Sequence, residues 1–107
     1  MVKVRITQPA EQDMQAALEW WRENRSVEQA ARWYRGIRKA VASLRSRPER
    51  CPEAPEADLL PQGMRQLLFG IGRRPTHRIV FTIADQEVRI LRVRHSSQDA
   101  LRGEDIR

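Results

Sequence analysis

The period of the hydrophobic pattern changes once along the chain, from a helical period in the first half to a strand period in the second. Between residues 8 and 47, apolar side chains recur three or four positions apart, the spacing of one helix face. After Gly63, apolar and polar side chains alternate, as in a half-buried strand. Helices followed by strands predict an α+β fold. The helical stripes are Ala10, Met14, Ala17, Leu18 and Trp21, then Ala30, Tyr34, Ile37, Val41 and Leu44.

Local signals indicate where the two helices begin and end. Thr7 precedes the first stripe and is a favourable N-cap, with Pro9 tolerated in the first turn. Ser26 and Gln29 have the spacing of a capping box, which marks the start of the second helix. That helix should end just before Pro48, because proline disfavours helix in the residue preceding it. Two helices joined by a few residues predict an antiparallel hairpin.

Four strands are expected around this helical hairpin. One precedes it and three follow it, at residues 2–6, 64–69, 76–83 and 87–94. Because short turns connect the last three, they should form an antiparallel meander. The prediction is one domain over residues 1–107: a two-layer α+β fold in the order β-α-α-β-β-β, with the hairpin on one sheet face. Segment 48–63, with four prolines, should be a connector, and the polar segment 95–107 should be loose at its end.

The last strand breaks the alternation. Val88 and Ile90 share one parity, whereas Leu91 and Val93 share the other. A β-bulge at this point is one explanation. The other is that both sheet faces are apolar, in which case the face away from the helices would be exposed and would indicate a partner.

The positive net charge of the chain indicates which classes of partner it could bind. The sequence has 20 Lys+Arg and 14 Asp+Glu, a net charge of +6, and only Lys3 and Lys39 are lysines. Arginine forms forked hydrogen bonds to phosphates and carboxylates, so the excess suits a nucleic acid, an acidic protein or simply a solvated surface. No apolar run approaches the ~18 residues of a membrane span, and residues 1–13 lack a signal-peptide core. We therefore expect a cytoplasmic protein without a membrane segment.

Few residues could hold a metal or a cofactor. Cys51, His77 and His95 are the only soft ligands, and their spacing fits no zinc pattern. The pair Gly70 and Gly72 lies between two expected strands, so it is typical of a hairpin turn and not of a phosphate-binding loop. We expect no metal and no cofactor.

One group of polar residues could carry chemistry. Arg65, Arg78, Arg94, His95 and Asp99 lie on or just after the expected strands, and a meander could bring them to one side or end of the sheet. Arginines beside a histidine can hold a scissile phosphate and move a proton, as an RNA-cleaving site requires. The alternative is that the arginines face solvent and that one of them pairs with Asp99.

Arg78, Arg94, His95 and Asp99 are also candidates for binding a partner, together with two further residues, Trp20 and Leu91. Trp20 lies about 100° from Trp21 around the first helix and away from the centre of the apolar stripe, so it is expected to be partly exposed. Leu91 would be exposed if the second sheet face were open.

The order and spacing of several motifs resemble the RelE/ParE toxin superfamily of plasmid-stabilisation and type II toxin–antitoxin modules. Segment 4–13 resembles the family's first strand running into its first helix, and segment 63–65 the start of its second strand. Segment 75–81 is similar to its third strand. Segment 88–99, with His95 in the turn, resembles its last strand and is the most specific match.

The resemblance implies an antitoxin that neutralises the toxin with a segment that is often helical and acidic. RelE-like members cut mRNA on the ribosome, and here Arg65, Arg78 and His95 would handle phosphate or protons. ParE-like members poison DNA gyrase. Leu67 stands where a strand lysine is usual in RelE-like members, and serines follow His95 where an arginine is usual. These departures favour the ParE-like branch, and we therefore assign no catalytic residue. The third alternative is a protein that still binds its antitoxin but is no longer toxic.

Overall fold

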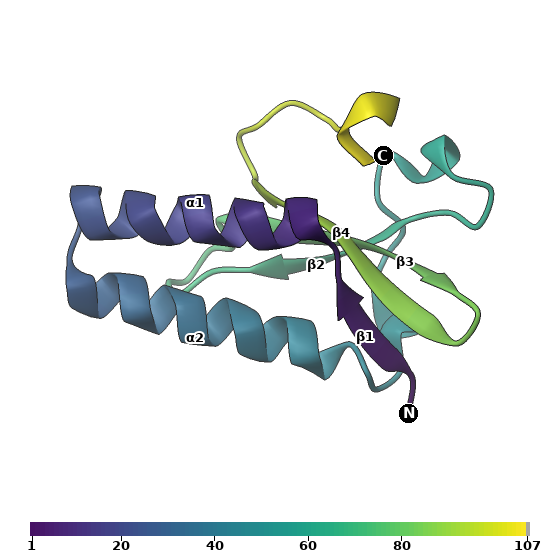
Figure 1. Cartoon of the computed structure of the whole chain (residues 1–107), viewed down its shortest axis with the longest axis horizontal. Helices are drawn as coiled ribbons and strands as arrows, with labels where there is room; N and C mark the ends of the chain where they lie inside the picture. The colour runs from purple at the N-terminus through teal and green to yellow at the C-terminus, as the bar shows by residue number, and fades with distance from the viewer. Residues whose placement is uncertain (107) are drawn as a thin grey trace.

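The computed structural model describes residues 1–106, and it confirms the α+β prediction (Figure 1). The helices are α1 and α2; the strands are β1 to β4; three 3-10 turns are η1 to η3. Their bounds are β1 Lys3–Ile6, α1 Gln8–Asn24, α2 Val27–Ser43, η1 Pro48–Arg50, η2 Ala57–Leu59, β2 Arg65–Phe69, β3 His77–Ala84, β4 Glu87–His95 and η3 Gly103–Ile106. None of the helices in the described part has the length and apolar content of a bilayer crossing.

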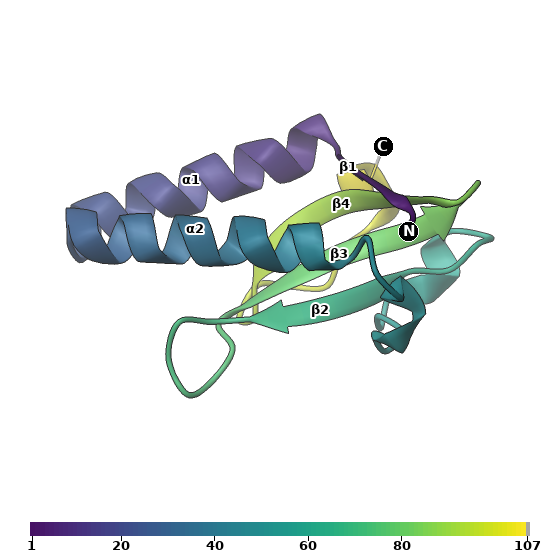
Figure 2. The same cartoon turned by 90° about the horizontal axis from the view of Figure 1, so that it is seen from below.

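One mixed sheet carries all four strands in the order β1-β4-β3-β2. The β2-β3-β4 meander is antiparallel as predicted, and β1 pairs in parallel with β4 at the edge. The β3–β4 turn is formed by Asp85 and Gln86, both with positive φ (55° and 60°), which matches the twist of a two-residue hairpin. The two helices lie side by side across one face of this sheet (Figure 2).

The predicted N-caps are confirmed. The Thr7 hydroxyl accepts from the backbone N–H of Ala10 at the start of α1, and the Ser26 hydroxyl accepts from that of Gln29 in α2. Thr7 also donates its hydroxyl proton to the carbonyl of Ile90 at 2.6 Å. The α1 cap therefore also attaches the helix to β4.

The core between helices and sheet contains one large residue absent from the predicted stripe. Trp33 is fully buried, whereas Tyr34, which was predicted there, is only partly buried on the flank. Trp33 packs edge-on against Phe69 of β2, with ring centroids 6.5 Å apart. Gly36 permits this approach, because a Cβ there would lie 2.6 Å from Phe69 Cζ.

A β-bulge explains the parity change in the last strand. Ile90 pairs with Phe81 and Arg92 pairs with Val80, so Leu91 is the extra residue. The bulge keeps both Ile90 and Val93 in the core on the helix side and turns Leu91 to the opposite face of the sheet.

The opposite face is apolar but not open, so the alternative of an exposed second face is wrong. The chain covers it with the 48–63 segment and the C-terminal segment. The resulting second cluster consists of Ala54, Met64, Val80, Leu91 and Leu101.

The prediction that segment 95–107 is loose at its end is also wrong for the described residues, which end at Ile106 in η3. Leu101 is buried, and its backbone N–H donates to the Glu56 carboxylate at 2.8 Å. Arg92 donates to the backbone carbonyl of Asp105 at 3.1 Å. The buried leucine and these two hydrogen bonds hold the segment against the sheet, despite its polar composition.

Candidate functional site

A groove of about 580 Å³ runs between α1 and the end of the sheet where β3 begins and β4 ends. One wall is α1 and the residue following it. The other is formed by the ends of β3 and β4 and by the turn after His95. Its lining residues are Asp13, Ala16, Ala17, Trp20, Trp21, Arg25, Thr76, His77, Val93, His95, Ser97 and Gln98.

The helix wall presents two aromatic rings. Trp20 is 49% exposed, which confirms the expectation of partial exposure, and Trp21 is half-buried beneath it. The two rings meet edge to face at 5.7 Å, and the Arg25 guanidinium lies 5.4 Å from the Trp20 ring centroid. This wall therefore offers an apolar surface with a cation at its rim.

The sheet wall contains two histidines on paired strand positions, and their rings meet edge to face. His77 is buried, and its ring centroid lies 5.2 Å from that of the exposed His95 and 5.0 Å from that of Trp33. Burial, and to a lesser degree the neighbouring His95, lowers the pKa of His77 to about 4. His77 is therefore neutral in the folded protein at pH 7.

His95 has a fixed tautomer when neutral. Its Nδ1 accepts from the backbone N–H of Ser97 at 3.1 Å and lies 2.7 Å from the Ser97 hydroxyl. An atom that accepts from a backbone N–H carries no proton, so the neutral ring is protonated at Nε2. The turn after β4 thus holds His95 in a defined orientation.

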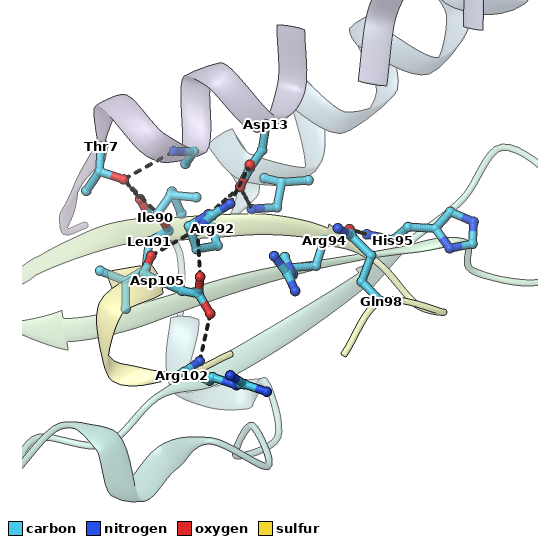
Figure 3. A network of polar contacts seen from close by, with 12 residues as sticks. Thr7, Asp13, Ile90, Leu91, Arg92, Arg94, His95, Gln98, Arg102 and Asp105 are labelled. Atoms are coloured by element: carbon cyan, nitrogen blue, oxygen red, sulfur yellow. Dashed lines mark hydrogen bonds and ion pairs between the residues drawn. The ribbon is translucent and has the colours of Figure 1, made fainter. Parts of the chain in front are cut away.

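Asp13 closes the inner end of the groove and joins three parts of the chain (Figure 3). Its carboxylate accepts from Nε and Nη2 of Arg92, at 2.7 and 2.9 Å, and from the backbone N–H of Val93 at 2.9 Å. Arg92 lies between Asp13 of α1 and Asp105 of the C-terminal segment. This ion pair fixes the helix wall relative to the sheet wall.

The five polar residues considered for catalysis do not lie in one place. Arg78 pairs with Arg94 across β3 and β4, on the face away from the helices, where Arg78 forms a two-pronged ion pair with Glu56. Hydrogen bonding from Arg78 lowers the pKa of Glu56. His95, in contrast, lines the groove on the helix side.

The other candidates have backbone contacts. Arg65 Nη1 donates to the carbonyls of Cys51 at 2.6 Å and Glu49 at 3.2 Å, near the far end of the meander. Arg94 donates to the backbone carbonyl of Asp99 at 2.9 Å, so Asp99 contacts an arginine through its main chain. Leu91 is buried in the second cluster.

Of the predicted site residues, only Trp20 and His95 line the groove. Asp13 and Arg25 were not among the predicted site residues, and His77 was considered only as a possible metal ligand. No group of three or more His, Cys, Asp or Glu side chains lies close enough to hold a metal ion within residues 1–106. The pairing of His77 with His95 follows from the strand register, and no local sequence signal reveals it.

The fold and groove define a small α+β domain with a surface suited to binding another chain. Residues 4–100 match the family described as the ParE toxin of the type II toxin-antitoxin system parDE. The chain belongs to this ParE toxin family.

The fold is similar to that of a solved chain described as "Chromosomal ParDE TA system from P. aeruginosa". The TM-score is 0.71 at 21% identity, over 89% of this chain and 96% of that chain. A likeness at this identity concerns the fold. No curated protein matches the chain.

Proposed function

We propose that this toxin acts in the cytoplasm by binding and poisoning DNA gyrase and that a cognate antitoxin neutralises it. Membership of the ParE family supports the proposal. The observation that carries it is the position of Arg78, the residue on which ribonuclease activity would most depend. Its guanidinium is 12% exposed and is occupied by the nearly buried Glu56 carboxylate, on the sheet face opposite His95.

The ribonuclease alternative requires one cluster of phosphate and proton handlers. Arg65 is occupied by two carbonyls, Arg78 by a carboxylate, and His95 lies across the sheet from Arg78. A general acid or base must reach the substrate that the cations hold. The arrangement therefore favours binding over RNA cleavage.

Pulse labelling after induction tests the target. DNA synthesis should fall within minutes while protein synthesis continues, and the purified chain should then increase DNA cleavage by purified gyrase. Early loss of translation would instead support the ribosome as the target and overturn the gyrase proposal. If neither synthesis changes while the protein is folded, the chain binds antitoxin without being toxic.

A double variant separates the roles of Arg78. Glu56→Gln with Arg78→Met removes both buried charges together and retains an oxygen that can accept from Leu101. Toxicity should persist, because a gyrase-binding protein does not use Arg78 as a phosphate ligand. Loss of toxicity with intact antitoxin binding would revive the ribonuclease alternative.

The groove is the proposed site for a segment of the antitoxin. Trp20 offers a half-exposed ring, and the Arg25 cation at the rim suits an acidic residue of the partner. Large aromatic anchors carry much of the energy of such interfaces. Because the chain carries +6, binding should also weaken as salt screens the charges.

Trp20→Ala is expected to weaken antitoxin binding by about 2 kcal/mol, or roughly 30-fold in the dissociation constant, through loss of this anchor. Isothermal titration with the purified antitoxin measures the effect. Leu68→Ala is the matched control, because Leu68 is 50% exposed but lies outside the groove. Equal effects of the two substitutions would contradict the assignment of the groove.

A further inference from the structure

The excess positive charge comes from two stretches of equal net charge: residues 27–50, in α2 and just after it, and residues 64–95, in the last three strands. Residues 27–50 contain seven Lys+Arg and two Asp+Glu, in a chain whose net charge is +6. The antitoxin groove uses α1 and the sheet end, so this charge lies on a different surface.

Three of these bases form a ridge along α2. Arg32, Arg35 and Lys39 are exposed and are spaced by three and four residues, which places them about 5–6 Å apart on one side of the helix. Among residues 1–106, no carboxylate lies within ion-pair distance of any of the three, whereas Arg38 pairs with Glu11 of α1. None of the three cations is therefore neutralised by an ion pair, and the nearest acid along the same side of α2 is Glu28, one turn before Arg32.

The β2–β3 loop extends the ridge. Arg32 Nη2 donates to the carbonyl of Ile71 at 3.2 Å, which attaches the loop to α2. Arg73 and Arg74 are exposed in this loop. Figure 2 shows the loop beneath the N-terminal half of α2. The three bases of α2 and the two bases of the attached loop are together named here the basic ridge: Arg32, Arg35, Lys39, Arg73 and Arg74.

We propose that the basic ridge binds the phosphate backbone of double-stranded DNA without reading its sequence. A DNA duplex presents a dense, regular row of phosphate charges, and arginine pairs with phosphate bidentately. The one large apolar side chain exposed within residues 27–50 is Val27, at the N-terminal end of α2 and outside the row of bases, so the ridge itself lacks the apolar centre of a protein–protein interface. It also lacks the exposed aromatic rings on which single-stranded bases stack, which favours a duplex.

The test uses the purified chain and a fluorescein-labelled 20-bp duplex, with fluorescence anisotropy measured at several salt concentrations. The variant Arg32→Gln/Arg35→Gln/Lys39→Gln removes three ridge cations. The control Lys3→Gln/Arg22→Gln/Arg102→Gln lowers the net charge equally with residues on β1, on α1 and beside η3. Circular dichroism confirms that both variants are folded.

The ridge variant should bind DNA at least about 10-fold more weakly, and the slope of log K against log salt should become shallower by about 2–3. The control should retain most of the wild-type affinity. Equal losses in both variants would mean that only net charge matters and would overturn the proposal. So would absence of binding by the wild type at low salt.

A polyglutamate peptide of the same total charge distinguishes nucleic acid from an acidic protein. The duplex should bind more tightly than the peptide, because its charges lie about 1.7 Å apart along the axis and binding releases the counterions condensed on it. Equal competition by the peptide would assign the ridge to an acidic protein instead. The assay contains no gyrase, so failure of the gyrase proposal leaves its result unchanged.

Discussion

Glu56→Ala is expected to lower the free energy of unfolding by about 3–5 kcal/mol, the largest effect of any exchange of a polar residue considered for this protein. The substitution leaves the Arg78 guanidinium buried without its carboxylate and removes the acceptor of the Leu101 N–H. It therefore weakens the attachment of the C-terminal segment as well as an ion pair. Urea unfolding followed by tryptophan fluorescence measures the change.

Asp58→Ala is the control for this measurement, because Asp58 is an exposed acid in the same connecting segment. It should change stability by less than about 0.5 kcal/mol.

The ionisation of Glu56 also predicts that the stability of the fold depends on pH. Its pKa is lowered by the hydrogen bond from Arg78, so its contribution is present above the unfolded pKa of about 4.3 and is lost as pH falls through the lower folded pKa. If Glu56→Ala is as stable as the wild type, the Glu56–Arg78 ion pair does not stabilise the fold.

Lowering the pH from 7 to 4 is expected to destabilise the protein by roughly 3 kcal/mol through His77 alone. The folded pKa is about 4 and the unfolded value about 6.5, so between these values the unfolded chain binds a proton that the folded protein does not. Stability therefore falls as the pH drops through this window and levels off for this residue below pH 4. Unfolding curves at half-unit pH intervals measure the slope.

His77→Asn should abolish most of this slope, because asparagine does not titrate, even if the variant is less stable at every pH. His95→Asn is the paired control. Burial, the larger cause of the His77 shift, remains in that variant, so most of the slope should remain. A slope that persists in His77→Asn would assign the acid sensitivity to other groups.

The candidate site was only partly predictable from the sequence. Trp20 could be placed at the edge of an apolar stripe because helical geometry fixes the angle between neighbouring positions. The partners of Arg78 and Arg92 could not be predicted, since Glu56 and Asp13 lie 22 and 79 residues away from them. Any carboxylate in the chain is chemically suitable for any arginine, so sequence alone does not select the pair.

The sequence by itself determined the order of helices and strands and the two N-caps, and it located the irregularity in the last strand without deciding between a bulge and a second apolar face. These features depend on side-chain periodicity and on hydrogen bonds within a few residues, which are local properties of the chain. Tertiary structure decided which ring of the Trp33–Tyr34 pair fills the core, because both positions fit the same helical stripe. It also decided that the C-terminal segment covers the second sheet face and that His77 meets His95, because strand register and the packing of distant segments depend on the whole fold.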